Sequence, residues 1–145
     1  MSPARLAARC SDLLGPVAGP VLLHAPAAAG LAAALATHVR PARAGETPVA
    51  AVVAFLGSPV HERQRLLAVV HTALGPGAPL VVVDHNQPRV WWRRLGGVAM
   101  LARRGFGPAR GRYPAARELA ALGFAVERLR LADGERVQLV LARRL

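Results

Sequence analysis

The fold is decided by three consecutive segments, PVAAVVAFLGS (48–58), PVHERQRLLAVVHTALGPG (59–77) and APLVVVDHN (78–86). The first and third are almost unbroken apolar runs, which is typical of parallel strands covered on both faces. The middle segment has the length and mixed composition of a helix, and its proline-glycine end terminates it. Strand, helix and strand in this order predict a parallel unit with ligand sites beyond the carboxyl ends of the strands.

The residues before this unit repeat the same alternation. Ser2 and Pro3 predict a helix start within residues 1–19, and the segment PVLLHA (20–25) predicts a short buried strand. LAAALATHV (31–39) predicts the next helix, and the polar residues 40–47 predict a loop. We therefore expect residues 20–86 to form a parallel core behind an N-terminal helix.

The residues after the central unit predict a different ending. Helical spacing of apolar residues and many arginines predict a basic helix and loop over residues 87–113. A short helix is expected within residues 114–122. Asp133-Gly134 predicts a hairpin between strands at 124–132 and 135–143, with a bulge near Glu127-Arg128. The whole chain, residues 1–145, is thus expected to be one three-layer α/β domain. Its sheet of about five strands is mostly parallel and ends in an antiparallel hairpin.

The composition of the chain excludes few functional classes. The net charge is +11, and all 19 basic residues are arginines. Arg, Ala, Gly and Pro have GC-rich codons, so the charge fits codon bias as well as an anionic partner. The single Cys10 excludes an intramolecular disulfide, and the sequence has no run long enough for a transmembrane segment. We expect a cytoplasmic protein, and we expect no metal site because the five histidines form no ligand cluster.

The element order resembles class I S-adenosylmethionine (SAM)-dependent methyltransferases, a Rossmann-like family. The resemblance is carried by LLAVVHTALGPGAPLVVVD (66–84), ARELAALGFAVERLRL (116–131) and the closing VQLVLARR (137–144). It covers roughly residues 49–145. It implies the family strand order 1-4-5-7-6, a transferase activity and SAM as the cofactor.

The N-terminal half departs from the family pattern in two ways. The turn that is usually glycine-rich reads APAAAG (25–30), and the expected acid is absent, so the cofactor site is degenerate. Residues 40–49 are too few for the next two strands, because a crossover alone needs about 10–12 residues. We therefore expect a shortened sheet with the first strand as an open edge, where a homo-oligomer or hetero-oligomer could assemble.

Three functions remain open. The chain is a reduced methyltransferase that still uses SAM, or a non-catalytic methyltransferase-like subunit or scaffold that binds a protein partner. The third hypothesis is an RNA- or phosphate-binding module formed by arginines and aromatic residues within 89–117. The competing interpretation of that segment is that Trp91 packs in the core while the arginines form a solvated face.

The candidate site residues follow from these hypotheses. Asp84 and His85, at the end of a strand, form an acid–base pair on one interpretation. On the other, Asp84 caps the turn and His85 is solvated. The resemblance implies cofactor contacts at His24, Ala25, Pro26, Gly30, Gly57 and Ser58. The candidates for substrate or anion binding are Asn86, Trp91, Trp92, Arg93 and Arg94.

Overall fold

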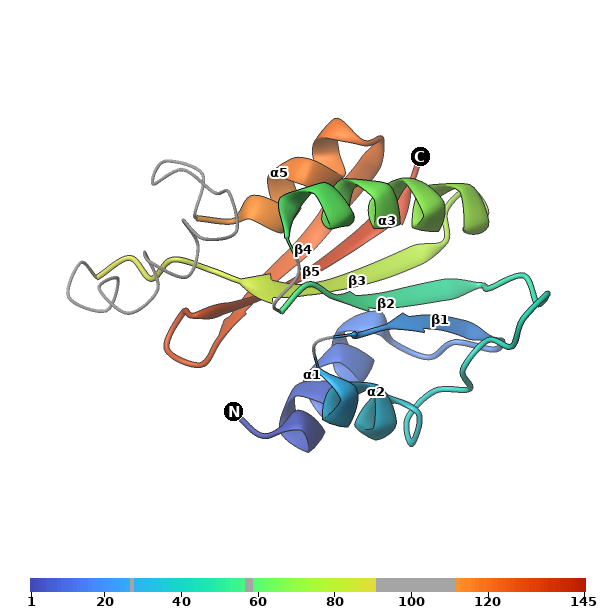
Figure 1. Cartoon of the computed structure of the whole chain (residues 1–145), viewed down its shortest axis with the longest axis horizontal. Coiled ribbons are helices and arrows are strands. Elements are labelled where there is room, and N and C mark those ends of the chain that lie inside the picture. The colour runs from blue at the N-terminus through green and yellow to red at the C-terminus, as the bar shows by residue number, and fades with distance from the viewer. Residues whose placement is uncertain (27, 57–58, 91–111) are drawn as a thin grey trace.

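The computed structural model describes residues 1–26, 28–56, 59–90 and 112–145, and in these ranges it contains one five-stranded sheet (Figure 1). The strands lie in the order β1-β2-β3-β5-β4. The first three are parallel, and the last two are antiparallel to their neighbours. Their bounds are β1 Val21–His24, β2 Ala50–Ala54, β3 Pro79–His85, β4 Phe124–Ala132 and β5 Val137–Arg144. The expected α/β fold class and the expected shortened strand order are confirmed.

The described helices cover the two faces of the sheet. Helices α1 (Pro3–Leu14) and α2 (Ala29–Leu35) lie on one face, and α3 (Val60–Ala73) and α5 (Pro114–Ala121) lie on the other (Figure 1). Alternate residues of the central strands enter two separate cores. Val81 and Val83 pack toward α1 and α2, whereas Leu80 and Val82 pack toward α3 and α5. This alternation explains the unbroken apolar runs, because both faces of β2 and β3 are buried.

Local signals set the element ends. The Ser2 side chain accepts a hydrogen bond from the Arg5 amide at 3.4 Å, and Gly15 ends α1 with a φ of 76°. Asp133 and Gly134 have φ angles of 52° and 62°, so the hairpin turns through the left-handed region as their residue types favour. The register of β4 against β5 shifts between Val126 and Arg128, which confirms the predicted bulge.

Strand β1 forms one edge of the sheet, as expected, but the chain itself covers part of that edge. The Val21 amide donates to the Arg40 carbonyl at 2.8 Å, and the Val21 carbonyl accepts from the Ala42 amide at 2.9 Å. The loop after α2 therefore pairs with the start of β1. The basic helix expected over residues 87–113 falls largely on residues 91–111, outside the described ranges.

Cys10 is on the buried side of α1 and has no exposed surface. Burial raises the pKa of its thiol to about 12. The thiolate is the reactive form, so this rise in pKa lowers the reactivity of the Cys10 thiol. We expect a disulfide reagent to leave Cys10 unmodified in the native protein and to modify it fully in denaturant. Rapid, complete reaction of the native protein would show that α1 detaches from the sheet.

Candidate functional site

The carboxyl ends of β1, β2 and β3 meet at one end of the sheet. His24 ends β1 beside Val53, and Ala54 ends β2 beside Val83. The next residue, Phe55, continues the pairing, since its amide donates to the Val83 carbonyl at 2.8 Å. Side chains that follow the three strands are therefore brought together at the carboxyl end of the sheet, where open parallel sheets bind ligands.

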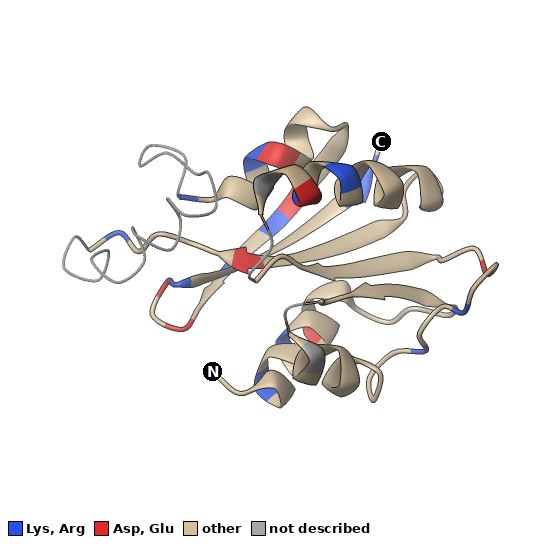
Figure 2. Ribbon diagram, in the orientation of Figure 1, with Lys and Arg blue, Asp and Glu red and all other residues tan. Residues whose placement is uncertain are grey.

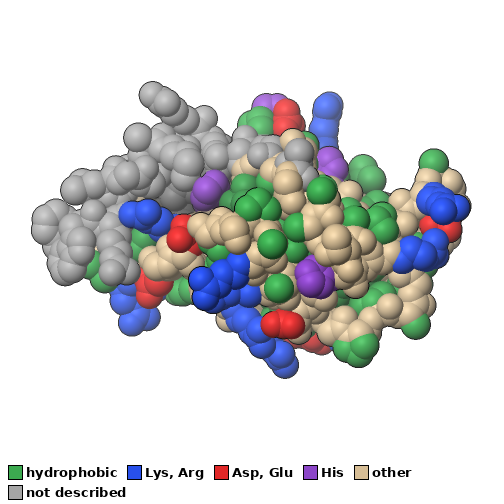
Figure 3. Space-filling view, turned by 90° about the horizontal axis from the view of Figure 1, so that it is seen from below, with side chains coloured by type: hydrophobic (Ala, Val, Ile, Leu, Met, Phe, Trp, Pro, Cys, Tyr) green, Lys and Arg blue, Asp and Glu red, His purple; other side chains and the backbone are tan. Residues whose placement is uncertain are grey.

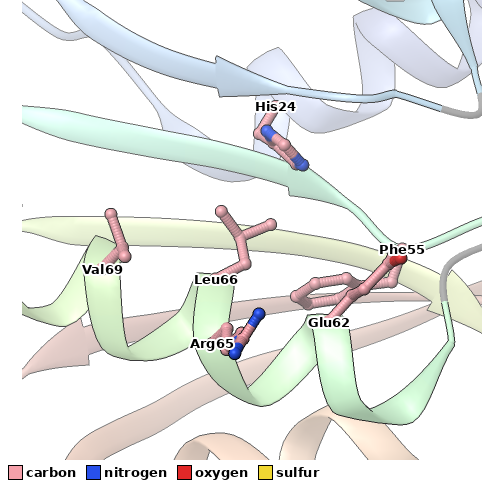
Figure 4. Close-up of a pocket in the computed structure, with 6 residues that line it drawn as sticks. All are labelled: His24, Phe55, Glu62, Arg65, Leu66 and Val69. Atoms are coloured by element: carbon pink, nitrogen blue, oxygen red, sulfur yellow. The ribbon is translucent and has the colours of Figure 1, made fainter.

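A cavity of about 320 Å³ opens beside these strand ends, between β1 and α3 (Figure 4). His24 borders it from the end of β1, and Leu66 borders it from α3. The wall combines apolar groups with one carboxylate, one guanidinium and one imidazole. Its lining residues are His24, Phe55, Glu62, Arg65, Leu66 and Val69. This volume lies at the small end of the range for small-molecule sites.

The turn between β1 and α2 closes on itself. The Ala28 amide donates to the Ala25 carbonyl at 3.1 Å, and Pro26 has no amide proton to offer. Gly30 is in the first turn of α2, and a Cβ there would lie 3.4 Å from the Cγ atom of Pro3. The space that Gly30 leaves is therefore on the side of α1. Of the predicted cofactor contacts here, His24 is the one that borders the cavity.

Asp84 lies in a buried cluster of charges between β3, α3 and α5. Its Oδ2 atom is 2.7 Å from Nη2 of Arg63, and the same nitrogen donates to Oε2 of Glu118 at 2.7 Å. The Arg63 guanidinium also stacks over the Phe55 ring at 4.5 Å. Arg63 has no exposed surface, and Asp84 is 1% exposed. The cluster therefore joins α3 to α5 through the end of β3.

The environment of Asp84 differs from that of an exposed acid at a strand end. Burial raises the pKa of Asp84, and the neighbouring Arg63 guanidinium and the His85 amide oppose that rise. The His85 amide donates to Oδ1 of Asp84 at 2.7 Å. Both carboxylate oxygens thus face groups of the chain, and the acid–base role of Asp84 and His85 stays a prediction.

Asn86 is 4% exposed and connects three segments. Its side-chain amide donates to the Glu135 carbonyl at 2.8 Å, and its side-chain oxygen accepts from the Tyr113 amide at 2.9 Å. Tyr113 precedes α5 with a φ of 55°. Asn86 therefore fixes the hairpin and the start of α5 against β3. The other predicted site residues, Gly57, Ser58, Trp91, Trp92, Arg93 and Arg94, lie outside the described residues.

Sequence reasoning missed four charged residues near the strand ends: Arg63 and Glu118 in the buried cluster, and Glu62 and Arg65 at the cavity. A signal for Arg63 was available, because it is spaced four and seven residues from the buried Leu67 and Val70 on one face of α3. No comparable signal marks Glu118, whose partner is 55 residues away.

Two further properties concern the described ranges. No three side chains of histidine, cysteine, aspartate or glutamate come together there as a set that would hold a metal ion. Within the same residues, every helix is too short or too polar to cross a bilayer.

No protein-family model matches the sequence, and no curated protein matches it at a significant level. Solved structures do match the fold. Human N-acetylserotonin methyltransferase in complex with SAM aligns with 97% of this chain and 51% of its own, at 15% identity and a TM-score of 0.57. The N-methyltransferase NodS from Bradyrhizobium japonicum aligns with 97% of this chain and 93% of its own, at 14% identity and a TM-score of 0.56.

A third structure, an O-methyltransferase family 2 protein from Planctomyces limnophilus in complex with apigenin, aligns over 86% of this chain. Its identity is 15%, its TM-score is 0.51, and this chain spans 42% of its length. This chain therefore covers about half, or less, of two of the three proteins. Similarity at these identities shows the architecture: the chain has the fold of SAM-dependent methyltransferases in a shortened form.

Proposed function

We propose that the chain is a methyltransferase-like protein that binds SAM in the cavity between β1 and α3. The observation that carries this proposal is the position of the cavity, which opens where β1 and β2 end in a sheet of the methyltransferase type. Ligands of open parallel sheets bind at such ends. The carboxylate of Glu62 stands at this cavity, although the acid that the family resemblance leads one to expect is missing from the sequence.

The residues around the cavity fit the parts of SAM. The apolar groups of Phe55, Leu66 and Val69 suit the adenine ring, and the Glu62 carboxylate is an acceptor for ribose hydroxyls. Arg65 would pair with the carboxylate of the methionine part. The self-closed turn at Ala25–Ala28 supplies fewer backbone donors than a glycine-rich turn would, so we expect modest affinity.

Bound SAM would supply an electrophilic methyl group on a sulfonium. The chain's part in transfer is to hold the acceptor close and in line, which does not require a general base. Gly57, Ser58 and the residues at 91–94 stay candidates for the remaining contacts to cofactor and acceptor.

Isothermal titration with SAM, and in parallel with S-adenosylhomocysteine, tests this proposal. We expect micromolar binding to the wild-type protein. In Glu62→Gln the affinity should fall about tenfold, because hydrogen bonds to a charged acceptor contribute about 1.5–3 kcal/mol. The control is Glu127→Gln, which makes the same charge change on the exposed strand β4.

Three results would count against the proposal. Absence of heat and of a thermal shift at millimolar ligand would mean that the fold has no cofactor site. Unchanged binding in Glu62→Gln would place the ligand outside this cavity. Equal weakening in Glu62→Gln and in Glu127→Gln would show a general effect of charge.

A second candidate function, a non-catalytic subunit that binds a protein partner, is favoured by the surface next to the same cavity. Val69 on α3 is 61% exposed, and Leu22 of β1 is half-buried because the described helices leave this corner of the sheet partly uncovered. Binding through β1 would hide that surface. A silent SAM titration together with a dimer in light scattering would favour this function over the first.

A further inference from the structure

The sheet face that carries α1 has a second hollow, on the opposite face from the cavity beside α3. A cavity of about 410 Å³ lies between α1 and the outer strands β4 and β5. Arg9 and Asp12 line it from α1, Arg130 and Leu131 line it from β4, and Leu139 lines it from β5. It is therefore bordered by one helix and by the two outer strands of the sheet.

Both borders carry arginines. Arg128 and Arg130 pair with Leu141 and Leu139 across the ladder, and these leucines belong to the core under α1. Residues directly opposite in a ladder share a face, so both arginines lie on the α1 face of β4. On α1, Arg5 and Arg9 are four residues apart and share one side of the helix. We name Arg5, Arg9, Arg128 and Arg130 the arginine row.

The positive charge of the arginine row is not neutralised within the described residues. All four side chains are exposed, and none of them has an ion-pair partner in the described part of the chain. Asp12 is the acid beside the row at the cavity. Glu127 on the same strand pairs with Arg143 at 2.7 Å. Figure 3 views the molecule from the α1 and α2 side and shows a run of blue side chains beside a red one.

We propose that the arginine row binds the phosphate backbone of a nucleic acid. Arg128 and Arg130 are two residues apart on an extended strand, so their backbone positions are about 6.6 Å apart by the usual rise. A polyanion has repeated negative charges that can each pair with one arginine of such a row. Guanidinium groups also donate paired hydrogen bonds to phosphate oxygens. The binding would be independent of the proposed SAM site, and contacts to phosphates carry no information about base sequence.

Other anionic partners fit this surface less well. Protein interfaces usually contain a buried apolar centre, and a membrane-binding surface inserts apolar side chains. Among the described residues the exposed large hydrophobic side chains are Met1, Val49, Val69, Val126 and Leu145, and none of them lines the cavity. On β4, Val126 pairs with Ala142, which belongs to the opposite core.

The test is fluorescence anisotropy with a labelled single-stranded RNA of about 20 nucleotides, titrated between about 50 and 200 mM salt. We expect the wild-type affinity to fall steeply with salt. In the double variant Arg128→Gln/Arg130→Gln, the slope of log affinity against log salt should decrease by about 1.4, or about 0.7 for each lost phosphate contact.

The matched control is Arg40→Gln/Arg43→Gln, which removes two exposed charges from the loop beside β1, at the other edge of the sheet (Figure 2). Its slope should stay close to that of the wild type. Absence of RNA binding, an unchanged slope in the β4 variant, or equal losses in both variants would overturn the proposal. Binding to anionic vesicles that depends on Arg128 and Arg130, without RNA binding, would also overturn it and assign the row to membranes.

Discussion

Replacing Asp84 with alanine is expected to lower the free energy of unfolding by about 3–5 kcal/mol, the usual cost of breaking a buried ion pair. The variant leaves the Arg63 guanidinium, which has no exposed surface, without its most buried counter-charge. Glu118 would remain within 2.7 Å, but its side chain is 20% exposed, so it compensates only in part. An arginine cannot respond by losing its proton.

Urea unfolding followed by circular dichroism measures this effect. Asp12→Ala is the control, since Asp12 is an exposed acid on α1, and it should change the stability by no more than about 0.5 kcal/mol. Asp84→Asn, which keeps a polar group of the same shape, should fall between the two. A loss below about 1 kcal/mol in Asp84→Ala would show that water reaches Arg63 and that the cluster is not a structural link.

The outcome also bears on function. The Asp84 carboxylate binds Arg63 and the His85 amide, and these contacts fix the position of the end of β3. If Asp84→Asn folds and still binds SAM with unchanged affinity, Asp84 positions the strand end and does not contact the cofactor. The chemistry would then rest on the cavity residues and on the predicted residues outside the described ranges.

The sequence predicted the elements well because local signals are strong here. Apolar runs that lie between proline and glycine residues predicted β2 and β3, and Ser2-Pro3 predicted the start of α1. The displaced apolar pattern in β4 predicted its bulge, and the structure shows the shift between Val126 and Arg128. In each case the residues that determine the element are close together in the sequence, so the local sequence pattern is enough to predict it.

The candidate site was predicted less well because it depends on contacts between distant segments. The sequence predicted Asp84-His85-Asn86 at the carboxyl end of a strand, with Asp84 and His85 as an acid–base pair or with Asp84 capping the turn. The structure instead buries Asp84 against α3 and α5, and it ties Asn86 to Glu135 and Tyr113. Similarly, Arg128 and Arg130 alternate with leucines, but the register against β5 was needed to place them on the α1 face. In these cases the position of a side chain depends on how segments that are distant in the sequence pack together.

Replacing Arg63 with methionine is expected to make the free energy of unfolding depend strongly on pH. Without the guanidinium, burial and the nearby Glu118 carboxylate would raise the pKa of Asp84 against the His85 amide only, so the pKa in the folded state would rise further above the value of about 3.9 in the unfolded chain. Below about pH 4 the Asp84 carboxyl is protonated in both the folded and the unfolded chain. Its raised pKa then has little effect on the free energy of unfolding. As the pH rises, the unfolded state releases the proton and the folded state keeps it, and stability falls by up to about 1.4 kcal/mol per pH unit.

Unfolding curves at a series of pH values from about 4 to 8 test this, relative to the wild type. The wild type should have a weaker slope, because Arg63 opposes the rise of the Asp84 pKa. Arg65→Met is the control: it removes an exposed charge from the same helix and should add no slope. The double variant Arg63→Met/Asp84→Leu should recover stability and lose the slope, since apolar groups often replace a buried ion pair without cost. A flat profile in Arg63→Met would mean that Asp84 ionises freely, and that the end of β3 is open to water where the structure shows it closed.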